Sequence, residues 1–389
     1  MSEFRTIREL CSVVVDCPHS TPKWTANGKI VIRNKNIKHG KIDFSSPSYT
    51  DDEHFAQRIK RAKPQPGDII ITREAPIGDV GMIPENTECC LGQRMVLLRA
   101  NQSVCDNFYL LYSLQSLYVQ HQISWSEGTG TTVSNLRIPH LEQIQIPYLP
   151  LEQQAKISSV LRALEEKIEN NRRLNDNLQQ QAFSVFDNLI ANAENNDYTV
   201  SDYAFLNPKR TLAKNQVARS IDMSQLSTSG AFPSGWEMKP FNGGMRFTNG
   251  DTLFARITPC LENGKTAFID FLDDGEVAFG STEYIVLAPK NDTPPEMLYC
   301  LARYPAFVDY AVKNMNGSSG RQRVSAETVG QYRLPLFDKH SLVLFKEVVS
   351  PMFLMMRYNS LENMRLAELR DALLPKLMSG EIDVSAVQL

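Results

Sequence analysis

The residues of this chain that could carry chemistry do not have the spacing that catalysis requires. The six histidines are scattered, and none has the spacing of a metal site. Neither a G-x-S-x-G nucleophile turn nor a G-x-G-x-x-G phosphate loop occurs. Gly264-Lys265-Thr266 resembles the end of a phosphate-binding loop, but Pro259 stands where that loop needs its first glycine. The sequence therefore favours a protein that binds or organises over one that catalyses.

Basic side chains gather in two stretches that suit contacts with phosphates. Ten basic and four acidic residues lie between Lys23 and Lys63, and four basic and no acidic residues lie between Lys209 and Arg219. Solvated surface loops explain these clusters nearly as well. The formal net charge of -3 does not by itself indicate a nucleic-acid binder.

The cysteines and the hydropathy pattern exclude several classes of protein. The seven cysteines are odd in number and form no C-x-x-C pair, so neither a disulfide framework nor a zinc site is indicated. Apolar runs fall far short of the ~20 residues of a membrane span, and the first residues lack an apolar signal core. We expect a cytoplasmic protein with no metal and no membrane contact.

A heptad seam that occurs twice predicts the elements that position the basic stretches. The first copy runs through Leu161, Leu164, Ile168, Asn171, Asn175, Leu178, Ala182, Val185 and Leu189. The second copy lies 188 residues later, since Asn171 corresponds to Asn359 and Asn175 to Asn363; it runs through Met352, Met356, Asn359, Asn363, Leu366, Arg370, Leu373 and Leu377. Apolar residues in this alternation of three and four are typical of a coiled coil, and the shared Asn block indicates an internal duplication.

Each seam predicts a long helix that needs a partner for its apolar stripe. The first helix, from about Leu151 to Ala191, would be roughly 60 Å long, and its own copy is the obvious partner. We expect antiparallel pairing, because a whole module lies between the helices and must return the chain. Facing Asn residues cost stability but fix the register, so Asn171→Leu with Asn359→Leu should stabilise the coil and loosen its register. Pro351 should break or kink the second helix.

A similar module precedes each helix. Pro66-Gly-Asp-Ile-Ile-Ile-Thr-Arg73 is matched by Asn249-Gly-Asp-Thr-Leu-Phe-Ala-Arg256, in each case a Gly-Asp turn and then a short buried strand that ends on an arginine. A small-residue loop at 127–134 is likewise matched by 316–325. We predict an α+β fold with two duplicated modules, 1–148 and 196–336, and helical regions at 149–195 and 337–389. The antiparallel coiled-coil pair would separate the modules with pseudo-two-fold symmetry, as a ruler for a two-part linear target. Two unrelated surface helices on separate cores are the alternative.

Three stretches carry a resemblance to a known family. They are Ile146-Pro-Tyr-Leu-Pro-Leu-Glu-Gln-Gln154, Asn359-Ser-Leu-Glu-Asn363 and Leu369-Arg-Asp-Ala-Leu-Leu-Pro-Lys-Leu-Met-Ser-Gly-Glu-Ile382. With these stretches the whole chain resembles the specificity subunits of type I restriction–modification systems. One departure is Leu334-Pro-Leu-Phe-Asp-Lys-His340, where the family usually repeats a Pro-Leu-Glu-Glu-Gln-like entry to the helix.

The resemblance implies a subunit without an active site. It would choose the sequence of double-stranded DNA for an assembly with two modification subunits and, for cleavage, restriction subunits that carry motor and nuclease. S-adenosylmethionine would bind to the modification subunits, and ATP with magnesium to the restriction subunits, so this chain would hold no cofactor. The modules would be target-recognition domains that each read half of an interrupted site, and the helices would set the gap and dock the modification subunits.

Within that family role, the residues that reach DNA must come from loops and helix ends of the recognition domains. Reading of the major groove needs Arg, Lys, Asn, Gln or Thr. Our candidates are Arg33, Lys35, Arg73, Thr129, Thr131 and Thr132 in the first module, and Arg219, Arg256, Ser318, Arg321 and Arg323 in the second. Surface ion pairs or turns are the competing explanation for each of them.

Two other functions stay open at this point. A coiled-coil adaptor that assembles proteins without reading DNA would also use duplicated modules on paired helices. An enzyme with an unrecognised site is the third possibility. DNA pull-down with the methyltransferase partner separates the first two, and methyl transfer or hydrolysis by the purified chain alone would support the third.

Overall fold

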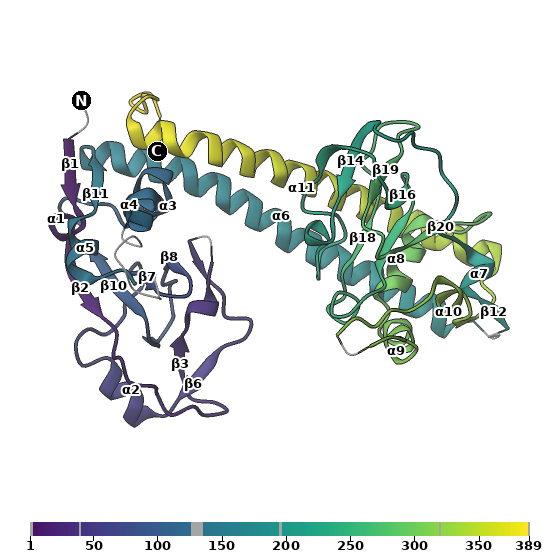
Figure 1. Ribbon diagram of the computed structural model, residues 1–389, viewed down its shortest axis with the longest axis horizontal. Helices are drawn as coiled ribbons and strands as arrows, with labels where there is room; N and C mark the ends of the chain where they lie inside the picture. Colours follow the sequence, from purple (N-terminus) through teal and green to yellow (C-terminus); the bar gives the residue numbers. More distant parts are fainter. Residues whose placement is uncertain (1–2, 39, 126–134, 194–196, 319, 388–389) are drawn as a thin grey trace. The chain divides into compact units, whose positions relative to one another are not determined.

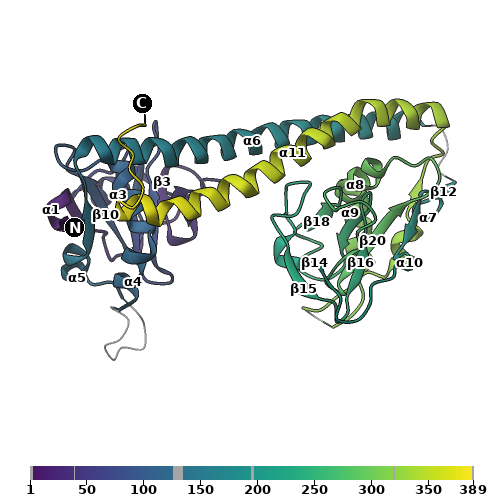
Figure 2. The same ribbon diagram turned by 90° about the horizontal axis from the view of Figure 1, so that it is seen from above.

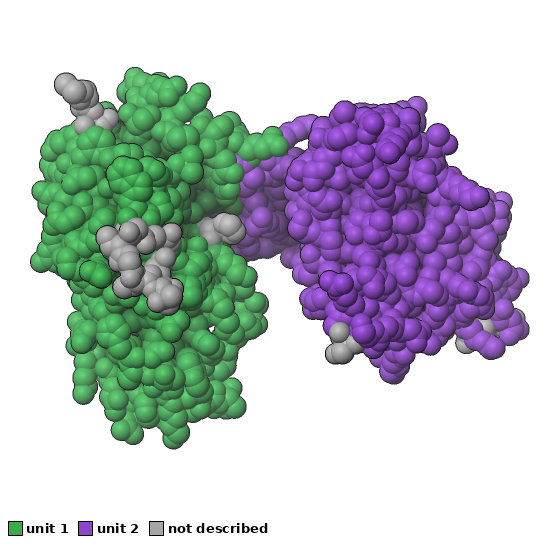
Figure 3. Space-filling view, in the orientation of Figure 1, with its two compact units in different colours: residues 1–165, 368–389 green, residues 166–367 purple. Residues whose placement is uncertain are grey.

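The computed structural model describes residues 3–38, 40–125, 135–193, 197–318 and 320–387. It divides into two compact units, coloured separately in Figure 3. Unit 1 comprises Met1–Glu165 and Glu368–Leu389, and unit 2 comprises Glu166–Ala367. Both units mix strands with helices, which confirms the predicted α+β class. Among the described residues, no helix is long and apolar enough to cross a membrane.

Unit 1 is built on a four-stranded antiparallel sheet with the strand order β2-β10-β7-β8. A second sheet has the order β6-β3-β9, in which β3 and β9 run parallel. Two short ribbons, β1-β11 and β4-β5, complete the unit. The bounds are β1 Glu3–Thr6, β2 Cys11–Asp16, β3 Lys29–Ile32, β4 Ile37–Lys38, β5 Lys41–Ile42, β6 Ser48–Thr50, β7 Ile69–Arg73, β8 Ile77–Met82, β9 Cys89–Leu91, β10 Met95–Ala100 and β11 Gln145–Tyr148.

Unit 2 repeats the four-stranded sheet of unit 1 and extends the second sheet by one strand, β16. Its four-stranded antiparallel sheet has the order β13-β20-β17-β18, and its second sheet, β15-β14-β19-β16, again contains one parallel pair, β14 with β19. The ribbon β12-β21 corresponds to β1-β11. The bounds are β12 Tyr198–Thr199, β13 Ala204–Leu206, β14 Val217–Ile221, β15 Glu237–Pro240, β16 Met245–Phe247, β17 Thr252–Ala255, β18 Thr266–Phe268, β19 Ala278–Gly280, β20 Tyr284–Pro289 and β21 Arg333–Leu334. The shared strand order supports the internal duplication.

The two Gly-Asp turns precede buried strands, as predicted. β7 and β17 are central strands of their sheets, and their apolar side chains are almost fully buried. Gly67 and Gly250 have φ of +83° and +86°, a region that glycine enters without steric cost. The Asp68 and Asp251 side chains accept hydrogen bonds of 2.8 Å from the backbone N–H groups of Gln65 and Thr248, which closes each turn.

Short helices cover the sheets and fill the connections. A capping box holds each first helix: Thr6 and Glu9 at α1, and Thr199 and Asp202 at α7. The bounds are α1 Ile7–Leu10, α2 Asp52–Arg58, α3 Asn107–Gln115, α4 Leu117–Trp125, α5 Ile138–Gln143, α7 Val200–Tyr203, α8 Pro295–Arg303, α9 Pro305–Lys313 and α10 Ala326–Gly330, with short 3-10 turns at η1 Asn34–Asn36 and η3 Met223–Gln225.

Two long helices, α6 (Leu151–Ala191) and α11 (Lys339–Ser379), carry the seam (Figures 1 and 2). The bounds of α6 confirm the predicted first helix. The predicted break at Pro351 is wrong, because α11 continues without interruption through this residue. Proline has no N–H, so one backbone carbonyl in the preceding turn of the helix loses its hydrogen bond. Because Pro351 is exposed, water can solvate that carbonyl.

Each half of the helix pair belongs to the core of one unit. In unit 1, Ile157 and Leu161 of α6 share a buried cluster with Leu377 and Met378 of α11 and with the strands and helices of that unit. In unit 2, Phe186 of α6 and Phe353 of α11, both 1% exposed, join the second cluster. Burial of one such phenylalanine stabilises the fold by about 1.5–3 kcal/mol. The helices are therefore parts of both domain cores and not detached spacers.

The polar block of the seam fixes an antiparallel register in unit 2. Asn171 Nδ2 donates to Asn363 Oδ1 at 3.0 Å, and Asn359 Nδ2 donates to Asn175 Oδ1 at 2.8 Å. A step forward along α6 is thus matched by an equal step back along α11. The halves of α6 and α11 in unit 1 run in the same antiparallel direction. Glu165 lies 3.7 Å from Arg370, and Lys156, earlier in α6, donates to the carbonyl of Ser385, which follows α11 (3.0 Å).

This register corrects the double substitution that the repeat suggested. Asn171 and Asn359 are equivalent by sequence but do not face each other, so Asn171→Leu with Asn359→Leu would leave Asn363 and Asn175 without their amide partners. The facing pairs are Asn171 with Asn363 and Asn175 with Asn359. No residue of the predicted seam is exposed: each is buried or half-buried.

Candidate nucleic-acid interface

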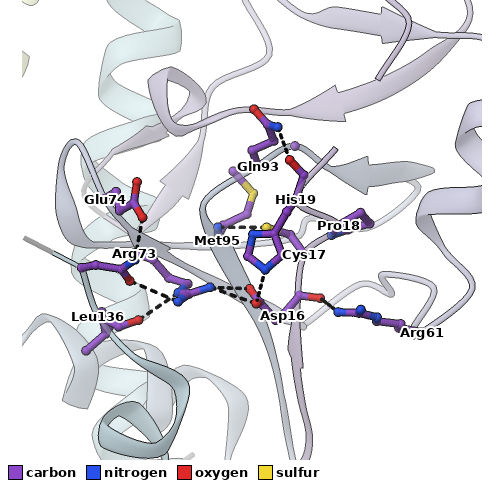
Figure 4. A network of polar contacts seen from close by, with 12 residues as sticks. Asp16, Cys17, Pro18, His19, Arg61, Arg73, Glu74, Gln93, Met95 and Leu136 are labelled. Carbon is purple, nitrogen blue, oxygen red and sulfur yellow. Dashed lines mark hydrogen bonds and ion pairs between the residues drawn. The ribbon is translucent and has the colours of Figure 1, made fainter. Parts of the chain in front are cut away.

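Arg73, at the end of β7, is the centre of a polar network in unit 1 (Figure 4). Its Nη1 donates to both carboxylate oxygens of Asp16 at 2.9 Å, and its Nε donates to the carbonyl of Leu136 at 2.8 Å. Its Nη2 donates to Asn135 Oδ1 at 3.1 Å. The side chain is only 11% exposed. This geometry joins three distant segments, so Arg73 is held as a structural anchor, and its contact with DNA stays a prediction.

The network extends from Arg73 to an open hollow on the same unit. Asn135 Nδ2 donates to Glu74 Oε1 at 2.6 Å, and Glu74 Oε2 lies 3.2 Å from Arg94 Nε. The backbone carbonyl of Glu74 accepts a hydrogen bond of 2.5 Å from Asn34 Nδ2. The anchor therefore positions two side chains, Asn34 and Arg94, that line the hollow.

The hollow has a volume of about 330 Å³ and a basic lining. It is lined by Pro22, Trp24, Arg33, Asn34, Lys35, Ala75, Gly92, Gln93 and Arg94. Two predicted residues, Arg33 and Lys35, are thus brought together here, and both are exposed. The Arg33 guanidinium lies 5.0 Å from the centre of the Trp24 ring, and Lys35 Nζ lies 3.5 Å from Ser46 Oγ. A wall with three cations, one aromatic face and no acidic residue suits a nucleic acid.

Unit 2 gathers three of its predicted residues around one carboxylate. Glu283 accepts hydrogen bonds from Arg323 Nε and Nη2 at 2.7–3.0 Å, and Arg256 Nε lies 3.9 Å from Glu283 Oε2. The bound Arg323 guanidinium holds the pKa of Glu283 below its usual range, and the same contact raises the pKa of Arg323. Arg321 reaches this cluster through its backbone carbonyl, which accepts from Arg323 Nη1 at 3.2 Å.

The side chain of Arg321 itself points to solvent. It makes no ion pair or side-chain hydrogen bond with the described residues, and its backbone N–H donates to the carbonyl of Ser318 at 3.0 Å in an exposed turn. A guanidinium held on a tight turn and left unpaired is well placed to contact a base or a phosphate.

Arg219, the remaining described candidate, is engaged by other side chains. The Arg219 side chain is 18% exposed, contacts Glu276 (2.5 Å) and Asp273 (3.2 Å), and lies 5.2 Å from the Trp236 ring centre. It is thus neutralised by two carboxylates. Thr129, Thr131 and Thr132 lie outside the described residues.

Sequence reasoning predicted Arg33 and Lys35 but not the other polar and aromatic side chains of the hollow, which are Trp24, Asn34, Gln93 and Arg94. Trp24 is 44% exposed, which only the structure shows; the signal in the sequence was its place next to Lys23, at the start of the basic stretch. Gln93 and Arg94 come from the turn between β9 and β10, and only the tertiary fold brings that turn to Arg33. Among the described residues, no group of three His, Cys, Asp or Glu side chains could hold a metal.

Comparison with known proteins points to one family. Residues 3–180 match the family model described as a type I restriction modification DNA specificity domain. The chain is 22% identical over 373 residues to the type I restriction enzyme MjaIX specificity subunit of Methanocaldococcus jannaschii, covering 82% of this chain and 78% of that protein. It is also 22% identical over 358 residues to the HindI specificity subunit of Haemophilus influenzae, covering 72% and 78%.

Higher identity is confined to segments, and the fold agrees over the full length. The chain is 33% identical over 133 residues to the EcoAI specificity subunit of Escherichia coli, and this match covers 22% of that protein. It is 30% identical over 123 residues to the putative MjaX specificity subunit of Methanocaldococcus jannaschii, and this match covers 28% of that protein. The crystal structure of a type I restriction-modification S subunit from M. genitalium covers 96% of this chain and 95% of its own, with 19% identity and a TM-score of 0.56. This likeness shows a common fold. The sequence matches show that residues 3–180 are similar to a type I restriction modification DNA specificity domain, and that the chain is similar over most of its length to the specificity subunits of type I restriction enzymes.

Proposed function

We propose that this chain is the non-catalytic subunit that selects the DNA sequence for a type I restriction–modification complex. Its two recognition domains, 1–148 and 196–336, each read one half of a bipartite site, and the helical regions 149–195 and 337–389 set the distance between the halves. Similarity to the type I restriction modification DNA specificity domain and to the specificity subunits supports DNA recognition.

One observation carries the bipartite part of the proposal: equivalent positions of the two units have opposite charges. Arg73 N–H donates to the carbonyl of Arg94 (2.8 Å), as Arg256 N–H donates to the carbonyl of Glu283 (3.0 Å), so Arg94 and Glu283 are equivalent. By the pairing of β3 with β9 and of β14 with β19, Arg33 corresponds to Asp222. The same fold with different side chains at these positions suits two different half-sites, since the pattern of hydrogen-bond donors and acceptors selects the base.

Docking of partner subunits on the helices is supported by the surface of α11. Its apolar side chains Val343, Leu344, Val348, Leu354, Met355 and Tyr358 are 42–56% exposed. Apolar groups exposed along one helix are typical of a surface that a partner helix covers. We propose that two modification subunits cover the helical regions and that restriction subunits join them for cleavage. S-adenosylmethionine, ATP and magnesium would bind to those partners, and this chain would hold no cofactor.

The test is reconstitution of the chain with the modification subunit of its own system. Methylome sequencing of cells with both proteins should reveal one interrupted motif, and cells with the modification subunit alone should lack it. Titration of the purified assembly with a duplex that carries the motif, at fixed salt, should give tighter binding than a scrambled duplex. An assembly that forms normally but shows no sequence preference would favour the adaptor function instead.

A further inference from the structure

The hollow of unit 1 has the features of a site that reads one particular base pair. Four chain segments form it: the segment at Pro22 and Trp24, the η1 turn with Arg33 before it, the turn at Ala75 between β7 and β8, and the turn between β9 and β10. Gly92 N–H donates to the carbonyl of Ile32 at 2.7 Å, and a Cβ at Gly92 would lie 2.7 Å from this same oxygen. Only glycine at position 92 therefore lets the turn between β9 and β10 approach Ile32 so closely.

Arg33 and Lys35 are the cations of the hollow without an ion pair among the described residues, and of the two only Arg33 carries a fork of donors. Arg94 is paired with Glu74, whereas Arg33 makes no ion pair with the described residues. Its guanidinium lies over Trp24, and its backbone N–H donates to Asn36 Oδ1 at 3.0 Å, which fixes the start of η1. A guanidinium positioned by an aromatic face keeps its fork of donors for a planar pair of acceptors.

Asn34 adds an unused acceptor beside this fork. Its Nδ2 is committed to the carbonyl of Glu74, which orients the amide, and its Oδ1 is buried without a hydrogen-bond partner. A buried carbonyl oxygen without a donor costs stability unless a ligand satisfies it. Arg33 and Asn34, consecutive in the chain and both in the lining of the hollow, thus supply a fork of donors and one acceptor without a partner.

We infer that this hollow is the site where unit 1 reads a G·C base pair in the major groove. Guanine presents two acceptors, N7 and O6, and its paired cytosine presents the N4 amino donor next to them. The Arg33 fork matches the guanine acceptors, and Asn34 Oδ1 matches the cytosine amino group. An A·T pair presents a donor where guanine has O6, so the same two side chains would reject it. The inference rests on the proposed function, because it assumes that unit 1 binds duplex DNA.

The equivalent place in unit 2 lacks this arrangement. Asp222 stands for Arg33, and its carboxylate pairs with Lys239 at 2.9 Å; Met223 stands for Asn34. A methionine cannot accept the cytosine amino group, and a carboxylate repels guanine acceptors. The G·C preference is therefore assigned to unit 1 alone.

The test measures how Arg33 couples to each base pair of the motif. The full chain is assembled with its modification subunit and titrated with two kinds of DNA. The parent duplex carries the unaltered motif found by methylome sequencing, and each other duplex carries that motif with one base pair substituted. Arg33→Ala should weaken binding of the parent roughly 10- to 100-fold and should abolish discrimination at a single G·C position, leaving the others intact. Asn34→Ala should relax the same position.

Two further variants separate base reading from charge and from misfolding. Arg33→Lys keeps the charge and should keep the dependence of affinity on salt while losing the preference at that position. Arg5→Ala is the matched control in unit 1, because Arg5 also lies over an aromatic ring (Tyr148, 3.5 Å) but outside the hollow; its preferences should equal those of the unmodified assembly. Melting midpoints show which variants are folded.

The outcomes are distinct. Equal weakening of every duplex by Arg33→Ala, with a salt slope reduced by about one, would make Arg33 a phosphate contact and overturn the inference. Unchanged preference at every position would overturn it too. Absence of any sequence preference in the unmodified assembly would instead reject the proposed function.

Discussion

Arg73 in unit 1 and Arg256 in unit 2 end the same strand of the same fold but have different surroundings. Arg73 is 11% exposed and makes four side-chain hydrogen bonds, two of them to Asp16. Arg256 is 29% exposed, and its charge partner Glu283 is already held by Arg323. The duplicated framework thus fixes where the arginine lies, while the residues that each unit supplies around it decide what the arginine does.

The Gly-Asp turns give a second example. Both aspartates are nearly fully buried and paired with an arginine, but Asp68 pairs with Arg99 of β10, and Asp251 pairs with Arg210, which precedes β14. The turn needs a charged partner for its buried carboxylate, and the two units obtain that partner from different places in the chain.

The largest expected effect separates the two equivalent arginines. Arg73→Ala removes the Nη1 group that donates to both oxygens of the half-buried Asp16 carboxylate, and it should destabilise unit 1 by about 3 kcal/mol. Arg256→Ala should cost unit 2 about 1 kcal/mol or less, because Glu283 retains Arg323. Hydrogen exchange of the β7 and β17 amides measures the two units separately. Equal losses in both would contradict the different roles.

A slightly smaller effect is expected in the seam, where unit 2 has amides and unit 1 has leucines. Asn359→Leu alone deprives Asn175 Oδ1 of its donor and should lower stability by about 1–3 kcal/mol. Asn175→Leu with Asn359→Leu removes both amides and should recover that loss, with a gain in melting midpoint. Leu161→Asn in unit 1 is the reciprocal change and should lower the midpoint. A double variant less stable than the single one would argue against the facing pair.

The arginine turn of unit 2 should contribute about tenfold to specific DNA binding. Arg321→Ala with Arg323→Ala should weaken binding by the assembled methyltransferase, and Arg321→Ala alone should produce most of the loss, because Arg323 is engaged by Glu283. Arg323→Ala alone is the internal control. Unchanged affinity of the double variant, titrated at fixed salt, would remove these residues from the interface.

Exchange of charge at the equivalent positions 94 and 283 should shift affinity a few-fold in opposite directions. Glu283→Gln removes the carboxylate that engages two arginines, so non-specific DNA affinity should rise, with a steeper salt dependence. Arg94→Glu in unit 1 should lower it. Titration with a scrambled duplex at several salt concentrations measures both. If both substitutions shifted the DNA affinity in the same direction, positions 94 and 283 would not face DNA in the same way.

Acid should weaken unit 2 through Glu283 only at low pH. Its pKa in the folded protein is lowered, chiefly by the hydrogen bonds from Arg323, so its stabilising contribution is complete above its ordinary value of 4.5 and is lost as the pH falls through the lowered one. Melting midpoints of the wild type should therefore fall more steeply than those of Glu283→Gln below about pH 4.5. Parallel curves would show that the pair contributes nothing measurable.

The sequence by itself determined the duplication and the long helices, and it carried the resemblance to the specificity subunits. The spacing of apolar residues in the seam depends only on the helical repeat, so it predicted α6 correctly from Leu151 to Ala191. The Gly-Asp turns preceded buried strands for an equally local reason, since glycine at positive φ and an aspartate that caps the turn are properties of a few neighbouring residues.

Only the tertiary structure decided which residues meet. The facing partner of Asn171 is Asn363 and not its sequence equivalent Asn359, because antiparallel helices reverse the order of contacts. Pro351 does not end α11, since the packing of Phe353 and Met356 into the unit 2 core outweighs the loss of one exposed hydrogen bond. The hollow that joins Trp24, Asn34 and Arg94 depends on contacts between turns far apart in the chain, and no local pattern encodes such a meeting.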